Sequence, residues 1–248
     1  MTEDQTPTVQ EKSGWVASLI SNAKTIGWAL VFAFVIRTLV FEPFNIPSGS
    51  MKPTLLVGDY LFVSKMSYGL GKYSFPLLTG TLDYDGRILG EEPERGDVVV
   101  FRLPSDPTVD YIKRVVALPG ETVQVRAGVL YINGEPVKRE SRGERLVEDS
   151  RGFPLRVTEY LETLPGGREH LIWEVTDSGP LDNTPVFTVP EGHYFFMGDN
   201  RDNSQDSRVT RSVGPVPYEN LIGRADRLFF SVGDGMDIRF SRIGQAIE

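Results

Sequence analysis

Two serines, Ser48 and Ser50, lie on either side of a glycine in the stretch PSGSM, and this spacing could support acyl transfer. Pro47 fixes its own φ and Gly49 permits a positive φ, so the stretch is predicted to form a tight turn. Such a turn can expose a hydroxyl and point backbone N–H groups at one spot, as attack on a carbonyl requires. An ordinary Ser/Gly/Pro turn has the same composition, so these five residues alone leave both interpretations open.

A serine nucleophile needs a base, and the candidates are the two histidines and, among the lysines, Lys113. His170 and His193 lie in or beside strand-like runs without an evident orienting carboxylate. If residues 109–117 form a strand, Lys113 shares a largely apolar face with Tyr111. Burial there would lower the pKa of the lysine from ~10.4 toward neutrality, as a base requires. A lysine at a strand edge, with its ammonium in water, is the alternative.

A third stretch, GDNRDNSQDSR at 198–208, contains only glycine and polar residues. A polar loop is the simplest interpretation, because these side chains hydrogen-bond locally. The functional interpretation is a group of supporting residues, in which Ser204 hydrogen-bonds the base lysine and Asp206 pairs with Arg208. A calcium loop is excluded, because it would need a glycine at 207 and a glutamate at 213.

The composition excludes several classes of site. The chain has no cysteine, which removes disulfides, thiol nucleophiles and thiolate metal sites. It has two histidines and no HExxH spacing, so no protein-borne zinc site is predicted. The net charge of −8 gives no electrostatic support for nucleic-acid binding.

An apolar run, TIGWALVFAFVIRTLVF at 25–41, precedes the serines. Its length is at the lower edge of the roughly 17–25 residues that span a bilayer as a helix. Arg37 lies near one end, where its long stem can reach the headgroups. We predict an uncleaved single-pass anchor, which residues 13–23 could extend as an interfacial helix. A buried core helix and a cleaved signal peptide are the alternatives, although no A-x-A-type cleavage site follows.

Basic residues predict the orientation of this anchor. Lys12 and Lys24 precede it, and only Lys52 lies within fifteen residues after it. Residues 1–24 are therefore predicted to be a short cytoplasmic N-terminus and the remainder to be exported.

The pattern after residue 42 is β, with short β-branched and aromatic runs between Pro and Gly turns, ending in ADRLFFSV and MDIRFSRI. We predict an all-β fold, with a transmembrane helix followed by a catalytic core of barrel or sandwich type. The core comprises residues 42–118 and 190–248, and a smaller antiparallel β domain, 119–189, is inserted into it. Within the insert, the charged stretch 138–152 is predicted to be a solvated loop.

These stretches together resemble bacterial type I signal peptidases, also called leader peptidases. The resemblance runs from the apolar segment and EPFNIPSGSMKPTL through GDVVVF and DYIKRVVALPG to GDNRDNSQDSR, and covers about residues 26–244. Order and spacing agree, and jointly these motifs are highly specific. Some members of the family have two membrane spans, whereas this chain has room for one. Residues 138–189 match no family motif.

The resemblance implies a role for each matching residue. Ser50 would be the nucleophile, Lys113 its general base, and the Ser48 hydroxyl would join the Ser50 backbone N–H in the oxyanion hole. Four residues would support the site: Ser204 orienting the lysine, Asp206 and Arg208 as an ion pair, and Gly198 allowing close packing. Shallow pockets would accept small residues at the first and third positions before the scissile bond, lined by Phe44, Ile46, Pro47, Met51, Leu55, Tyr111 and Ile112.

The implied activity is cleavage of signal peptides from exported preproteins through an acyl-enzyme, without a cofactor or metal. The implied location is the bacterial cytoplasmic membrane, with the catalytic domain on the periplasmic side. Two other functions remain open from the sequence. A LexA-like self-cleaving regulator shares Ser-Lys chemistry but needs a DNA-binding domain where this chain has an apolar run. A membrane-tethered β module could bind a partner without catalysis.

Overall fold

The computed structural model describes residues 9–74, 86–149 and 151–248. These form one α-helix, α1 (Val9–Leu39), five short 3₁₀ turns, and antiparallel strands. The strands are β1 (Phe41–Asn45), β2 (Asp59–Ser64), β3 (Val98–Leu103), β4 (Asp106–Ala117), β5 (Thr122–Arg126), β6 (Val129–Ile132), β7 (Glu135–Pro136), β8 (Lys138–Glu148), β9 (Pro154–Thr163), β10 (Glu169–Glu174), β11 (Phe187–Thr188), β12 (His193–Met197), β13 (Val216–Pro217) and β14 (Leu221–Ser231). The 3₁₀ turns are η1 (Met66–Tyr68), η2 (Arg201–Asn203), η3 (Tyr218–Asn220), η4 (Asp234–Met236) and η5 (Phe240–Arg242). The predicted all-β fold with one N-terminal helix is confirmed.

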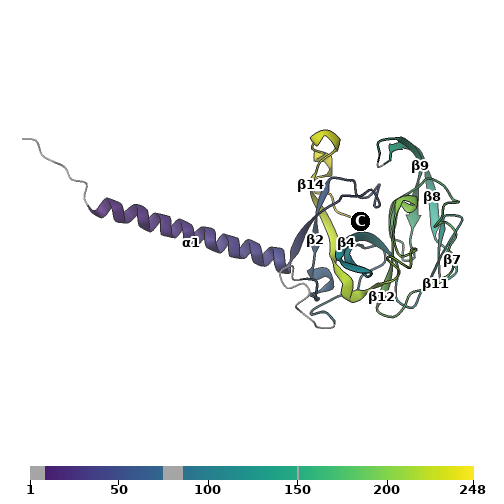
Figure 1. Ribbon diagram of the computed structural model, residues 1–248, viewed down its shortest axis with the longest axis horizontal. Coiled ribbons are helices and arrows are strands. Elements are labelled where there is room, and N and C mark those ends of the chain that lie inside the picture. The colour runs from purple at the N-terminus through teal and green to yellow at the C-terminus, as the bar shows by residue number, and fades with distance from the viewer. Residues whose placement is uncertain (1–8, 75–85, 150) are drawn as a thin grey trace, which may run out of the picture.

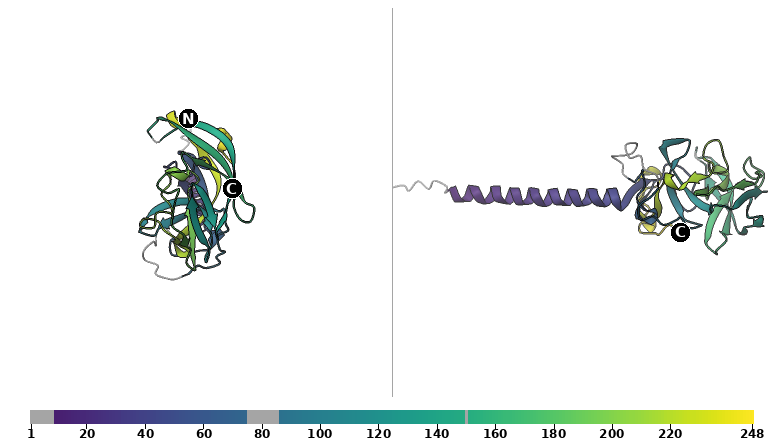
Figure 2. Two further views of the ribbon diagram at one scale, coloured as in Figure 1. Left: turned by 90° about the vertical axis from the view of Figure 1, so that its right-hand side faces the viewer. Right: turned by 90° about the horizontal axis from the view of Figure 1, so that it is seen from below.

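Helix α1 projects as a single rod away from the β structure (Figures 1 and 2). Its stretch Ser18–Arg37 is long and apolar enough to cross a membrane, and none of that stretch is buried against the protein. The helix is longer than the predicted span of 25–41, because it begins at Val9 and includes the upstream residues 13–23. It also ends earlier, since Phe41 already pairs with Ser64 in β1 and β2. Residues 1–8 of the predicted cytoplasmic N-terminus lie outside the described residues.

The largest sheet has seven strands in the order β1-β2-β14-β3-β4-β12-β13. The β-branched runs of β3 and β4 form its centre, with Val99 opposite Lys113 and Val98 opposite Arg114. Two apolar clusters pack on this sheet, one of them around Ile46, Leu61 and other side chains of β2, β3 and β14. The sheet therefore brings the end of β1 and the middle of β4, which are about seventy residues apart in sequence, into one region.

Residues 122–188 form two further sheets, one in the order β11-β5-β6-β7 and the other in the order β10-β9-β8. In Figure 1 these strands lie on the side of the β structure opposite α1. The division of the chain into domains at residues 118 and 189 stays a prediction.

The prediction of a solvated loop at 138–152 is wrong for residues 138–148. These residues form β8 and pair along their length with β9. Charged side chains line most of β8 because both of its faces are largely exposed, and this hides the alternation expected of a half-buried strand. Cross-strand ion pairs such as Arg156–Glu144, at 2.7 Å, accompany the backbone pairing.

The tail MDIRFSRI is a second departure from the predicted strands. Residues 234–236 and 240–242 form the 3₁₀ turns η4 and η5, and only an isolated bridge joins Val232 to Ile238. Buried Asp59 explains this shape, because Arg239 and Arg242 both reach back to its carboxylate. These side-chain contacts fold the tail against the 54–59 turn instead of extending it.

Candidate active site

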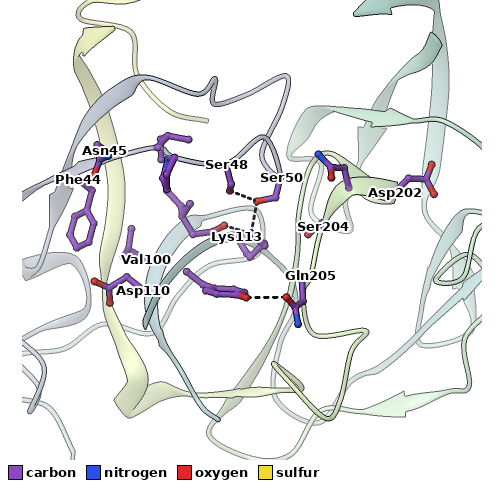
Figure 3. A pocket seen from close by; sticks show the side chains of 15 residues that line it. Phe44, Asn45, Ser48, Ser50, Val100, Asp110, Lys113, Asp202, Ser204 and Gln205 are labelled. Atoms are coloured by element: carbon purple, nitrogen blue, oxygen red, sulfur yellow. Dashed lines mark hydrogen bonds between the residues drawn. The ribbon is translucent and has the colours of Figure 1, made fainter. Parts of the chain in front are cut away.

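The serine turn, residues 47–51, follows β1 directly and brings Ser50 against the middle of β4. Lys113 Nζ donates a hydrogen bond of 2.7 Å to Ser50 Oγ and one of 2.8 Å to the carbonyl of Ile112. Both Ser50 and Lys113 are buried. Figure 3 shows the two side chains meeting at the centre of a cleft. A serine hydroxyl in direct contact with a buried amine is the arrangement that activates a serine for nucleophilic attack.

Burial lowers the pKa of Lys113 from 10.5 to about 8, because the charged form loses its hydration. The carboxylates of Asp206 and Asp199 act in the opposite direction and limit this fall. The lysine is therefore neutral in about a tenth of the molecules at pH 7, far more than an exposed lysine, and the neutral amine can accept the proton of Ser50.

The Ser48 hydroxyl lies 3.4 Å from Ser50 Oγ, on the same turn. An oxyanion donor must stand near the carbonyl that the nucleophile attacks, so this position is compatible with the role implied for Ser48. The backbone of the turn is fixed from the other side by Asn200. Its backbone N–H donates to the Ser50 carbonyl at 3.0 Å, and its side-chain amide donates to the Gly49 carbonyl at 2.9 Å.

The loop 198–208 lies beside the serine turn, as the functional interpretation required. Asp206 accepts two hydrogen bonds of 2.9 Å from the guanidinium of Arg208, and both side chains are buried. Asp206 also accepts a bond of 3.0 Å from the backbone N–H of Gly198. The predicted ion pair is therefore formed, and it holds the two ends of the loop together.

The predicted hydrogen bond from Ser204 to Lys113 is not formed within the described residues. The donors of Lys113 are directed to Ser50 and to the Ile112 carbonyl. The Ser204 hydroxyl is buried instead beside the α-carbon of Gly198. Ser204 does line the cleft, and its role in orienting Lys113 stays a prediction.

Gly198→Ala is expected to destabilise the protein by about 2 kcal/mol and to reduce activity, because overpacking displaces side chains and backbone. An added methyl group would lie 2.6 Å from the Ser50 carbonyl oxygen and would overlap the Ser204 side chain. Denaturant unfolding of the detergent-solubilised protein measures the change. Gly233→Ala is the matched control, since a methyl group there meets its nearest atom at 3.5 Å. Equal stability of the two variants would contradict this packing.

A cleft of about 720 Å³ extends from Ser50 along β1 and β4. Five predicted pocket residues line it, together with Val100, Asp110 and Gln205, which the sequence did not indicate. The five are Phe44, Ile46, Pro47, Tyr111 and Ile112. The prediction is wrong for Met51 and Leu55, which are fully buried in the apolar core below the turn. The chain turns inward after Ser50, with the Leu55 N–H bonded to the Met51 carbonyl, so these side chains face the core.

A buried ion pair next to the site was missing from the sequence interpretation. Arg114 donates to both carboxylate oxygens of Asp199, at 2.9 and 2.8 Å, and neither side chain is more than 1% exposed. Strand alternation indicated only that Arg114 faces away from Lys113. Of the two histidines, His170 is buried near this pair, and His193 bonds the Glu191 carbonyl. Neither histidine lines the cleft.

Comparison with known proteins adds a second line of evidence. Residues 19–230 match the family described as signal peptidase, peptidase S26. A signal peptidase I of Rickettsia typhi is 44% identical over 210 residues, covering 82% of this chain and 77% of that protein. One from Rickettsia prowazekii is 44% identical over 213 residues, covering 84% and 78%. A crystal structure of a signal peptidase I from Enterococcus faecalis shares 31% identity over 54% of this chain and 97% of that one, with a TM-score of 0.30. Because this TM-score is low, only the sequence matches bear on the family.

Proposed function

The chain belongs to the signal peptidase I family of peptidase S26, serine endopeptidases that cleave signal peptides, and we propose that Ser50 is its nucleophile and Lys113 its general base. The observation that carries this proposal is the 2.7 Å contact between Lys113 Nζ and Ser50 Oγ in a cleft. The lowered pKa of the lysine supports the same assignment. Preproteins that carry signal peptides are the substrates that the family implies.

In the proposed mechanism, neutral Lys113 accepts the proton of Ser50 as Oγ attacks the scissile carbonyl. The developing oxyanion receives hydrogen bonds from Ser48 and the Ser50 backbone N–H. The tetrahedral intermediate expels the amine of the mature protein, which takes a proton from Lys113, and leaves an acyl-enzyme on Ser50. Lys113 then removes a proton from water as the water oxygen attacks the ester carbonyl. Ser50 Oγ leaves and takes that proton back from Lys113, and the signal peptide is released with a new C-terminal carboxyl group.

The cleft suits an extended substrate with small side chains. β1 is an edge strand of its sheet, so an extended peptide can lie beside β1 and the segment that follows it. Phe44, Ile46 and Ile112 would then contact the residues just before the scissile bond. Pro47 and Tyr111 complete the proposed pocket wall. Tyr111 is held there by its hydroxyl, which donates to Gln205 at 3.2 Å.

The anchor helix supports a location at the membrane. We propose that α1 crosses the bacterial cytoplasmic membrane once, with the N-terminus cytoplasmic and the β structure on the periplasmic side. Ser50 follows Phe41 by nine residues, which reach at most about 30 Å at ~3.3 Å per residue. The nucleophile would therefore work near the bilayer surface, where the cleavage site of a membrane-inserted signal peptide emerges.

The pH dependence of cleavage tests the general base. We expect kcat/KM of the wild-type protein to rise about tenfold per pH unit below pH 7 and to level off above about pH 8. The sign follows from the lysine, since only its neutral form accepts the proton of Ser50 and that form predominates above its pKa of about 8. The profile is measured as initial rates on a preprotein in detergent, from about pH 5.5 to about pH 10, a range that brackets the lysine pKa. A maximum below pH 6, about two units under the lysine pKa, would refute a lysine base.

A further inference from the structure

A second groove, of about 630 Å³, adjoins the serine turn on the side toward β8, β9 and β10. It shares five lining residues with the cleft: Pro47, Ser48, Ser50, Asp202 and Asn203. Ser50 therefore stands where the cleft and the second groove meet. A peptide whose scissile bond lies at Ser50 Oγ can occupy both hollows at once, one on each side of the bond.

The far wall of the second groove is the β8–β9 hairpin, the segment to which the sequence gave no role. Val147, Leu155 and Val157 line the groove from this hairpin, and Trp173 lines it from β10. Val147 and Leu155 are half-buried, whereas Val157 and Trp173 are buried. The wall is thus apolar, and its half-buried side chains are accessible to a peptide in the groove.

The hairpin sheet is attached directly to the loop that holds the serine turn. The Trp173 N–H donates to the Asp199 carbonyl at 2.9 Å. The carboxylate of Asp202 accepts bonds from the backbone N–H groups of Val175 and Thr176 at 2.7 and 3.1 Å. Because the adjacent Asn200 bonds the serine turn, the wall has a fixed position relative to Ser50. This is the rigidity that a specificity subsite needs.

The path of the substrate assigns the two hollows, and this step rests on the proposed function. A signal peptide embedded in the membrane arrives from the side of α1, which in Figure 1 is opposite β8 and β9. In Figure 3, Phe44 and Asp110 lie on one side of Ser50 and Asp202 lies on the other. If the signal peptide occupies the cleft beside Phe44, the mature segment leaves through the second groove.

A positive charge lies on the serine-turn side of this groove. Lys52 lines the groove two residues after Ser50, and its stem lies over Gly49. Within the described residues, its ammonium makes no hydrogen bond or ion pair. Two carboxylates also line the groove: Asp202 accepts two backbone N–H groups, and Asp149 pairs with Arg151 at 2.9 Å. The exposed Glu148 lies on the hairpin, at the wall opposite the turn.

We propose that the second groove binds the first residues of the mature segment, and that Lys52 favours an acidic side chain at the second position after the scissile bond. The β8–β9 hairpin then contributes to substrate selection on the leaving side. The cleft selects small residues before the bond, and the second groove selects by charge and shape after it.

Three peptides and a charge reversal test the role of Lys52. Two long peptides share one signal segment and differ only in Asp or Lys at the second position after the scissile bond, and a short peptide ends as an amide one residue after it. The selectivity is the kcat/KM of the Asp peptide divided by that of the Lys peptide, measured with the full chain in detergent. Lys52→Glu is expected to lower this ratio about fivefold, the effect of losing an exposed charge pair. Cleavage of the short peptide measures any general effect of the charge reversal on the nearby serine turn, and the rates on the long peptides are divided by it. Lys138→Glu, an exposed lysine of β8 that lies outside the groove, is the control.

A pair of neighbouring variants tests the wall. Val147→Trp would fill the groove, whereas Leu146, which is 75% exposed and does not line the groove, points to the other face of β8. We expect Val147→Trp to raise KM several-fold for both long peptides and to leave the short peptide unaffected, with no effect of Leu146→Trp. An unchanged ratio in Lys52→Glu, or equal effects of Val147→Trp on long and short peptides, would overturn this proposal. Cleavage of the short peptide by Ser50→Ala would instead refute the proposed function.

Discussion

Ser50→Ala is expected to abolish signal-peptide cleavage, with a fall in kcat of about 10⁴-fold or more. The reason is that Oγ forms the acyl bond, and within the described part of the chain no other hydroxyl accepts a hydrogen bond from Lys113 Nζ. Ser48 Oγ is 3.4 Å from Ser50 Oγ, but Lys113 donates to Ser50. Initial rates on a preprotein in detergent measure the loss. The variant keeps the fold, because alanine removes only one oxygen from a turn that is held by its backbone bonds to Asn200.

Ser48→Ala is the matched control for this prediction, since it removes the same atom two residues earlier in the turn. It is expected to lower kcat by about 10²-fold, the effect of losing one oxyanion donor, with KM little changed. Residual cleavage by Ser50→Ala at the level of Ser48→Ala would exclude Ser50 as the nucleophile. An acyl-enzyme trapped on Ser50 and identified by mass spectrometry would support it independently.

The sequence predicted the central pair of this site because both predictions used local rules. Proline and glycine fix the shape of a turn within a few residues, and a strand alternates its side chains at every position. Lys113 therefore emerged as a lysine on an apolar face, and the structure buries it. That Ser50 meets it depends on sheet order, which residue patterns do not encode and which only the family resemblance implied.

The sequence failed where a side chain takes its partner from a distant segment. Asp199 pairs with Arg114, 85 positions away, and Asn200 bonds the turn 151 positions before it. The sequence pointed the Ser204 hydroxyl at Lys113, whereas in the structure it packs beside Gly198. In β8, exposure on both faces removed the apolar alternation by which a strand is recognised. Each failure concerns tertiary context rather than local preference.

The burial that makes Lys113 a base also makes it unfavourable for folding. Its pKa is 10.5 in an unfolded chain and about 8 in the folded protein, so folding releases a proton between these values. Below pH 8 the folded state holds a charged, poorly hydrated ammonium, and stability is reduced by on the order of 3 kcal/mol relative to pH above 10.5. The carboxylates of Asp206 and Asp199 keep this penalty from being larger.

Lys113→Met is therefore expected to change activity and stability in opposite directions. Methionine keeps most of the buried volume but has no proton to exchange, so kcat should fall by about 10⁴-fold, as for loss of an activating base. At pH 7 the free energy of unfolding should rise by about 1–3 kcal/mol, because the penalty of a buried ammonium is removed. Denaturant unfolding at pH 7 and pH 10 measures this, and the gain should shrink at the higher pH as the wild-type lysine loses its charge. A Lys113→Met protein that is inactive and also less stable would indicate a structural role, whereas one that cleaves preproteins at the wild-type rate would exclude the lysine as the base.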